Sequence, residues 1–166
     1  MLLGLKINGE PVTGRTEIPW DTIESVLGSA LTKRGRDGLS IKLSWLHKYI
    51  TGNGMPGPPS DLHLFRTYVF YLIGTRLMPN YTGNLVHLKW LPLLNKSPQE
   101  VGQYSWGSAC LAVVYRSLCE AAEFGVNKFE GCTLLLQAWA YSRMICIAPV
   151  PRNPPPAETL PPLANM

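Results

Sequence analysis

Charged residues are scarce in this sequence. Asp, Glu, Lys and Arg make up 16% of its 166 residues, whereas roughly 25% is usual in soluble proteins. The hydrophobic fraction of 46% is ordinary, and five residues are tryptophan. This composition indicates a domain that hides much of its surface, or a fragment of something larger. The length suits one domain, which at this size buries enough apolar surface to fold without disulfides or metals.

Long hydrophobic runs are also lacking, which argues against a signal peptide and a membrane span. The apolar start ends at Lys6 and is too short for a signal peptide. The run from Cys132 to Ile147 is interrupted by Gln137 and Arg143 and is shorter than the roughly 20 residues that a bilayer requires. The four cysteines show no CxxC spacing, so we expect them to be small core residues in a reducing compartment: Cys110, Cys119, Cys132 and Cys146.

The residue patterns of catalytic, metal and cofactor sites are missing too. His47, His63 and His87 stand apart from one another and from the cysteines, so no zinc spacing exists. We expect His87 to be a hydrogen-bonded residue at a loop-to-helix junction. Ser105 lacks the preceding glycine of a nucleophile elbow and is better placed to cap a helix. The sequence therefore predicts no enzyme, no cofactor and no metal site.

Two strongly apolar helices are predicted between Gly102 and Arg143. The first, Trp106–Glu123, is apolar around most of its circumference, and the second, Cys132–Met144, has Gln137 as the only strongly polar side chain before Arg143. Helices of this kind are normally enclosed by others. We therefore expect this pair to be buried at the centre of the domain.

Further helices are predicted upstream from apolar spacing and from cap residues. They are Trp20–Leu27, Ser40–Ile50 with Ser40 as its cap, Asp61–Leu77, a brief helix within 88–94, and a turn that begins with the capping-box pattern Ser97-Pro98-Gln99-Glu100. The predicted fold is all-α, a single compact domain of five or six helices over residues 1–148. Residues 149–166 are rich in proline without an apolar period, and we expect a disordered tail.

Several motifs resemble one known family in the same order along the chain. They are GEPVTG (9–14), PNYTGNLVHLKWLPLL (79–94), VGQ (101–103), YSWGSACLAVVYRSLCEA (104–121) and GCTLLLQAWAYSR (131–143). Together they resemble the plant mobile domain of the MAIN-like proteins, whose copies also occur in transposable elements. The family's apolar segment before residue 2 and its structured continuation are missing here, so the chain is expected to be truncated at both ends.

The resemblance implies a non-enzymatic protein-interaction module in the nucleus. The family is tied to meristem maintenance, genome integrity and silencing of transposable elements, and some members act with a type-7-like plant Ser/Thr protein phosphatase. The label "aminotransferase-like" attached to the family would require a lysine beside a phosphate cup. No lysine of this sequence has such neighbours.

Two other interpretations remain open. Lys33, Arg34 and Arg36 form a basic loop that could contact nucleic acid phosphates, as in a remnant of a mobile element, although a solvated loop explains them better because no aromatic residues are interleaved with them. The chain could also be an inactive truncated copy.

Three polar side chains on the two apolar helices need a role. They are Arg116, Gln137 and Arg143, and we expect each to be buried and to hydrogen-bond a helix end, a loop carbonyl or a carboxylate.

Overall fold

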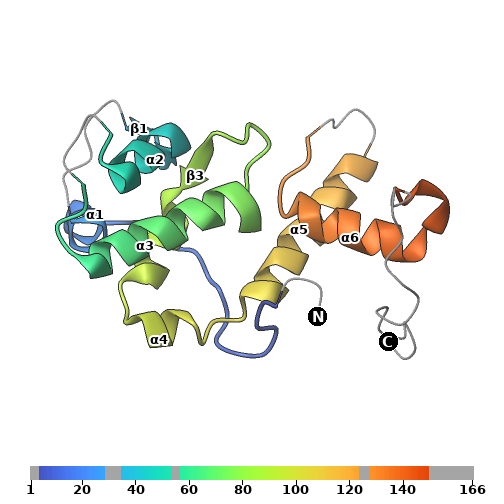
Figure 1. Ribbon diagram of the computed structural model, residues 1–166, viewed down its shortest axis with the longest axis horizontal. Helices are drawn as coiled ribbons and strands as arrows, with labels where there is room; N and C mark the ends of the chain where they lie inside the picture. The colour runs from blue at the N-terminus through green and yellow to red at the C-terminus, as the bar shows by residue number, and fades with distance from the viewer. Residues whose placement is uncertain (1–3, 29–34, 54–56, 124–127, 150–166) are drawn as a thin grey trace.

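The computed structural model describes residues 4–28, 35–53, 57–123 and 128–149, and helices dominate these parts of the chain (Figure 1). The predicted all-α class is confirmed. The tail predicted to be disordered lies, from residue 150 onward, outside the described residues. Within the described parts, no helix is both long and apolar enough to cross a membrane.

Helical segments occur along the whole described chain. Their bounds are α1 Trp20–Leu27, α2 Leu43–Thr51, α3 Asp61–Leu72, η1 Ile73–Leu77, η2 Leu88–Leu94, α4 Pro98–Val101, α5 Trp106–Ala122, α6 Thr133–Arg143 and η3 Ile145–Ile147. α3 passes directly into the π-helical turn η1, and η2 and η3 are 3-10 helices. The predicted capping box of α4 is confirmed, because the Ser97 side chain and the Glu100 side chain each accept from the other's backbone N–H.

A small antiparallel sheet, which the sequence did not predict, joins two distant parts of the chain. Its strands β1 Arg36–Asp37, β2 Ser40–Lys42 and β3 Leu85–His87 are in the order β1-β2-β3. Ile41 of β2 is paired with Val86 of β3, and both are buried. The prediction that Ser40 caps a helix is therefore wrong, because Ser40–Lys42 is extended against β3 and α2 begins only at Leu43.

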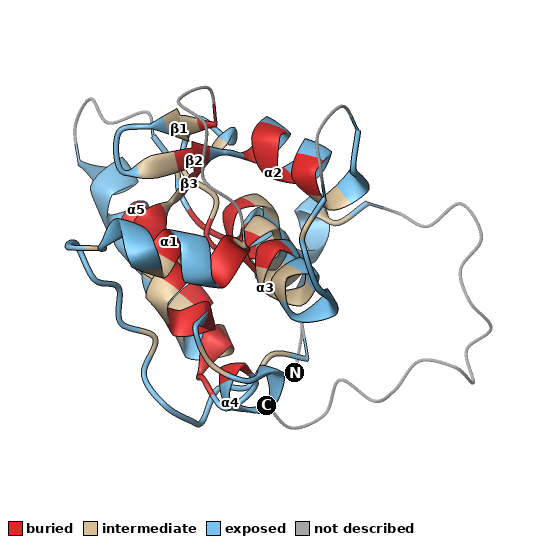
Figure 2. Cartoon of the chain, turned by 90° about the vertical axis from the view of Figure 1, so that its left-hand side faces the viewer, coloured by how far each residue is buried: buried red, intermediate tan, exposed pale blue. Residues whose placement is uncertain are grey.

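The main core lies where α1, α2 and α3 meet the sheet and η2. Figure 2 shows buried residues along the inward sides of these helices. Fully buried side chains come from each of these parts and from η1: Leu27, Ile41, Leu46, Phe70, Ile73, Leu91 and Leu94. α3 contacts the core through Thr67, Phe70 and the following turn, while Leu62 is 39% exposed.

One edge of α5 is buried, and α6 lies outside the core. Trp106, Cys110, Val114 and Ser117 follow one side of α5 inward, whereas α6 has no buried residue. α6 packs through the half-buried Leu135 and Leu136 on a small cluster around Cys110, Val114 and Cys132. Figure 1 shows α5 and α6 at the end of the molecule away from α1 and α2. The prediction of a buried central helix pair is wrong for α6, because apolar composition does not supply the elements that would cover it.

The first turn of α5 is held by the N-terminal segment. Glu10 and Tyr104 form a parallel bridge, and the Glu10 carbonyl accepts both from the Ser105 N–H and from its hydroxyl, each at 2.9 Å. Ser105 therefore stands at the predicted cap position, but its hydroxyl donates to Glu10 and does not accept from the helix. A Cβ at Gly9, which has φ +155°, would lie 2.1 Å from the Gln103 carbonyl oxygen. Only glycine allows this approach.

Candidate functional site

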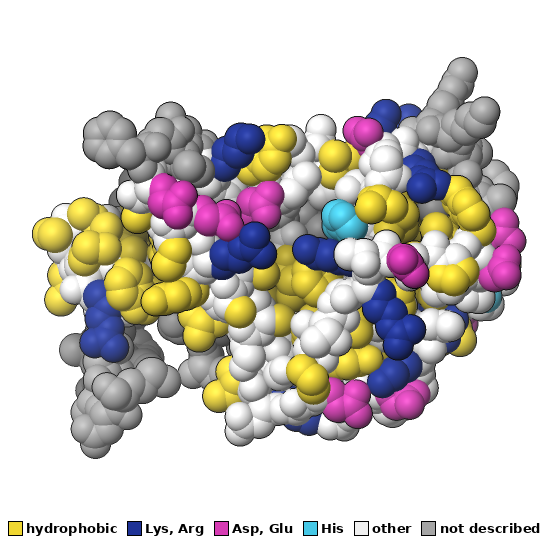
Figure 3. All heavy atoms as spheres, turned by 180° about the vertical axis from the view of Figure 1, so that it is seen from behind, with side chains coloured by type: hydrophobic (Ala, Val, Ile, Leu, Met, Phe, Trp, Pro, Cys, Tyr) yellow, Lys and Arg dark blue, Asp and Glu magenta, His cyan; other side chains and the backbone are white. Residues whose placement is uncertain are grey.

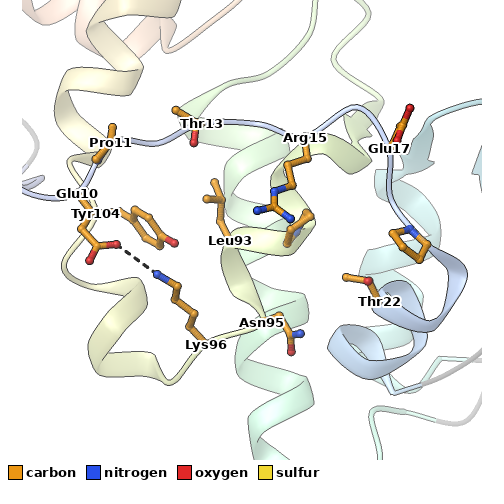
Figure 4. Close-up of a pocket in the computed structure, with 12 residues that line it drawn as sticks. Glu10, Pro11, Thr13, Arg15, Glu17, Thr22, Leu93, Asn95, Lys96 and Tyr104 are labelled. Carbon is orange, nitrogen blue, oxygen red and sulfur yellow. Dashed lines mark hydrogen bonds and ion pairs between the residues drawn. The ribbon is translucent and has the colours of Figure 1, made fainter.

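A cavity in the described part of the chain lies between the N-terminal segment and η2. It has a volume of about 540 Å³ and is lined on one side by residues 10–19 and on the other by Pro92, Leu93, Asn95 and Lys96 (Figure 4). The Arg15 N–H donates to the Lys89 carbonyl at 3.2 Å, which fixes the extended segment beside η2. Residues of the GEPVTG and NLVHLKWLPLL motifs thus form opposite walls of one cavity.

Polar groups at one end of this cavity satisfy one another. Lys96 Nζ lies 3.2 Å from a Glu10 carboxylate oxygen, and 4.9 Å from the centre of the Tyr104 ring. Hydrogen bonds, with Tyr104 first and Glu10 second, raise the pKa of Lys96 above its ordinary value. Lys96 is therefore protonated, and its positive charge is paired with the Glu10 carboxylate.

Polar groups in the rest of the cavity have no partner among the described residues. The side chains of Arg15, Glu17 and Asn95 line it and form no hydrogen bond or ion pair with the described parts of the chain. Figure 4 shows Arg15 extending from the N-terminal segment into the cavity, with Asn95 on the other wall. A volume in this range is typical of small-molecule sites.

A second, smaller cavity of about 330 Å³ lies between β3 and α5. His87 borders it, and the His87 Nδ1 accepts from the Lys89 N–H at 3.0 Å at the start of η2. His87 is hydrogen-bonded at the start of η2, as predicted, but the element that precedes η2 is strand β3 and not a loop. Burial, and secondly the charge of Lys89, lower the pKa of His87. The imidazole is therefore neutral at pH 7 and leaves Nδ1 free to accept.

The outward faces of α5, α6 and η3 carry exposed apolar side chains, which we call the α5–α6 surface. It consists of Leu111, Tyr115, Leu118, Leu134, Trp139, Tyr141, Met144, Ile145 and Ile147, with Tyr115 70% and Ile145 82% exposed. Figure 3 shows hydrophobic side chains gathered at this end of the molecule, with acidic side chains beside them. Exposed carboxylates on or next to α5 are Glu120, Glu123 and Glu130.

The structure corrects the predicted burial of three polar residues. Arg116, Gln137 and Arg143 are all exposed. Arg116 Nε donates to Glu120 Oε1 at 2.8 Å, one helical turn away, which is an exposed pair of modest value. A partly buried arginine that the sequence did not single out is Arg66 of α3. Its two terminal nitrogens donate to the carbonyls of Ser25 and Lys96 at 3.2 and 3.3 Å.

The structure describes only Arg36 of the three residues in the predicted basic loop. Lys33 and Arg34 lie outside the described residues. The Arg36 guanidinium lies 4.5 Å above the centre of the Trp20 ring, and its Nε donates to the Gly38 carbonyl. Arg36 is thus engaged within the protein, and binding of nucleic acid by these three residues stays a prediction.

The cysteines divide into two classes. Cys110 and Cys132 are buried, as expected, whereas Cys119 and Cys146 are exposed, so the prediction of four core cysteines is wrong for these two. Burial, and secondly Cys132, raise the pKa of Cys110 to about 12. In the part of the chain that the structure covers, no group of three or more His, Cys, Asp or Glu residues could hold a metal ion.

Comparison with known proteins identifies relatives along most of the sequence. A family model described as "Plant mobile domain" matches residues 1–164. A "Serine/threonine-protein phosphatase 7 long form homolog" of Arabidopsis thaliana is 36% identical over 148 residues, which is 87% of this chain and 11% of that protein. "Protein MAIN-LIKE 2" of the same plant is 34% identical, over 85% of this chain and 21% of the relative.

"Protein MAINTENANCE OF MERISTEMS", also from Arabidopsis thaliana, is 28% identical over 85% of this chain and 30% of its own length. The chain therefore spans between about a tenth and a third of the relatives that it matches. No solved structure matches it.

Proposed function

Because this chain belongs to the plant mobile domain family, we propose that it is a protein-interaction module that catalyses no reaction. The same segment matches a protein named as a phosphatase homolog and proteins whose names state no enzymatic activity. Protein interaction is a role that all of these relatives could share, and a single catalytic activity is not. The observation that supports docking most directly is α6, an apolar helix without one buried residue.

The partner surface proposed here is an apolar helix flanked by lysine or arginine. Tyr115 and Trp139 are large exposed aromatic side chains of the kind that supply most of the binding energy at interfaces. Glu123 and Glu130, on or next to α5, form no ion pair with a described residue, and Glu120 pairs with Arg116. Basic side chains on the partner would complement these carboxylates and would exclude acidic competitors.

The partner that we propose is a type-7-like plant Ser/Thr protein phosphatase, and the site of action is the nucleus. The similarity to a protein named as a phosphatase 7 homolog supports this choice. Roles in meristem maintenance, genome integrity and silencing of transposable elements would follow from that association. The name "Protein MAINTENANCE OF MERISTEMS" supports the first of these roles, and the other two rest on the family resemblance alone.

Binding of the purified chain to the purified phosphatase, measured by calorimetry, tests the proposal. We expect Tyr115→Ser and Trp139→Ser each to weaken binding about tenfold or more, since a central aromatic side chain contributes roughly 2 kcal/mol. Tyr68→Ser is the matched control, because Tyr68 is 50% exposed on α3, outside the α5–α6 surface. Glu123→Lys should weaken binding through the charge reversal.

Three results would count against this proposal. If Tyr68→Ser weakened binding as much as Tyr115→Ser, the α5–α6 surface would not be the docking site. If the wild-type chain did not bind the phosphatase at all, that partner would be wrong and the inactive-copy interpretation would gain support. A fluorescent fusion that remained outside the nucleus would contradict the proposed location.

A further inference from the structure

The cavity beside η2 contains two cations in different situations. Lys96 is paired with Glu10 at 3.2 Å and also contacts Tyr104, so its charge is compensated within the protein. The Arg15 guanidinium extends into the same cavity and has no ion pair with a described residue (Figure 4). The segment that carries Arg15 is tied to η2 through the backbone N–H of Arg15, so the backbone of this residue is held beside the cavity while its side chain is exposed.

We infer that this cavity binds a carboxylate group and that Arg15 is its anchor. A guanidinium presents parallel N–H donors that match the two oxygens of a carboxylate. The Asn95 side-chain amide, on the other wall, is a further donor without a described partner. Pro92 and Leu93 give the carbon part of the ligand an apolar surface. The site is separate from the α5–α6 surface and does not rest on the proposed function.

A carboxylate fits the charges of this cavity better than a phosphate does. One unpaired guanidinium balances one negative charge. The Lys96–Glu10 pair adds no net charge, and the Glu17 carboxylate, which has no ion pair with a described residue, repels a dianion more strongly than a monoanion. The ligand is thus a monoanion, either a free small carboxylic acid or the acidic side chain of a peptide.

Titration with sodium acetate at constant ionic strength tests the inference on the whole chain. In proton–nitrogen NMR spectra, the Arg15 Nε–H and Asn95 side-chain signals should shift and saturate, with a Kd on the order of a few mM. Arg15→Gln should weaken binding about tenfold or more, and Arg15→Lys should weaken it less. Glu17→Gln should strengthen binding about twofold to threefold, because a repelling charge is removed.

Arg76→Gln is the matched control, since Arg76 is an exposed arginine of η1 that does not line the cavity. An equal loss of binding in this variant would overturn the inference, because it would show that acetate responds to surface charge in general. Inorganic phosphate that binds tenfold more tightly than acetate would also overturn it, as would the lack of any saturable shift. Thermal melting followed by circular dichroism confirms that each variant is folded.

Succinate and the capped peptide acetyl-Ala-Asp-Ala-amide distinguish the two sources of the carboxylate. The compound that binds more tightly to the wild-type chain, and more weakly to Arg15→Gln, represents the kind of ligand that the cavity selects. If both bind as weakly to the wild-type chain as to Arg15→Gln, the site has no role in either and the inference is wrong.

Discussion

Gly74 lies at a close approach between η1 and β3. A Cβ at this position would lie 2.6 Å from Val86 Cβ and 2.8 Å from Leu43 Cδ2, both in the core. Since added volume in a packed core costs about 1 to 3 kcal/mol, we expect Gly74→Ala to lower the free energy of unfolding in urea by that amount. Gly57→Ala is the control, because the nearest atom to its Cβ is 3.7 Å away. Equal losses would show that the contact is looser than described.

His87 makes the stability of the fold depend on pH. Its pKa is lowered from 6.5 by burial and by Lys89, so the unfolded chain takes up a proton more readily than the folded chain. The free energy of unfolding should therefore fall as the pH drops below about 6.5. His87→Asn keeps an acceptor for the Lys89 N–H but does not titrate, and should reduce this loss between pH 7 and 5.

Urea denaturation of both chains across this range measures the effect of His87. His47 and His63 are present in both chains, so the difference between the two pH profiles isolates His87. Parallel profiles would mean that His87 has the same pKa in the folded and unfolded states.

The cysteines should differ in chemical reactivity. Cys119 and Cys146 are exposed, whereas Cys110 is buried and has a pKa raised to about 12. Because the thiolate is the reactive form, we expect iodoacetamide at pH 8 to alkylate Cys119 and Cys146 in the native protein and to leave Cys110 and Cys132 unmodified. Mass spectrometry of the digested protein identifies the modified sites. All four should react in denaturant, and early labelling of Cys110 would show that its cluster opens readily.

At the scale of the element, α6 should contribute little to the stability of the isolated chain. Trp139 is 50% exposed, whereas Phe70 of α3 is fully buried. We expect Trp139→Ser to lower the free energy of unfolding by about 1 kcal/mol or less, and Phe70→Ala to lower it by about 3 to 5 kcal/mol. Urea denaturation of the two variants and of the wild-type chain measures these changes in the free energy of unfolding. A large loss for Trp139→Ser would place α6 in the core, as its composition had suggested.

Elements with local signals were predictable from the sequence. α1 lies between Pro19 and the left-handed Gly28, and α4 has a complete capping box, so both occur where the sequence indicates. The sheet was missed because Ile41 pairs with Val86, a residue far along the chain, and no local pattern records that contact. The exposure of α6 was missed for a related reason, since periodicity shows which side chains are apolar but not what covers them.

The candidate sites show the same limit. The hydrogen-bonded role of His87 at the start of a helix could be inferred from its position ahead of an apolar run, and the hydrogen bond to Lys89 confirms it. Arg15 and Asn95, by contrast, line one cavity because the backbone of the Arg15 segment is tied to Lys89. Neither residue has a catalytic or binding motif, so no sequence pattern selects the cavity.

At the scale of the whole molecule, the α5–α6 surface should let the folded chain bind hydrophobic probes. Contiguous apolar patches of more than a few hundred Å² are uncommon on monomers and bind hydrophobic probes. We expect the native chain to enhance the fluorescence of the dye anilinonaphthalene sulfonate. In the double variant Trp139→Ser/Ile145→Ser, this enhancement should be reduced about twofold or more. Leu62→Ser/Tyr68→Ser removes exposed apolar groups from α3 and is the control. Equal losses would mean that the dye binds elsewhere.

The attachment of the N-terminal segment to α5 has a consequence for biosynthesis. The Ile7 carbonyl accepts from the Ser108 hydroxyl, and the Lys6 carbonyl from the Gly107 N–H, across about a hundred intervening residues. The ribosome adds residues one at a time, so Lys6 and Ile7 must wait for most of the domain to be translated before their partners exist. The contacts of Lys6 and Ile7 are therefore completed late in synthesis, only after the first turn of α5 has emerged.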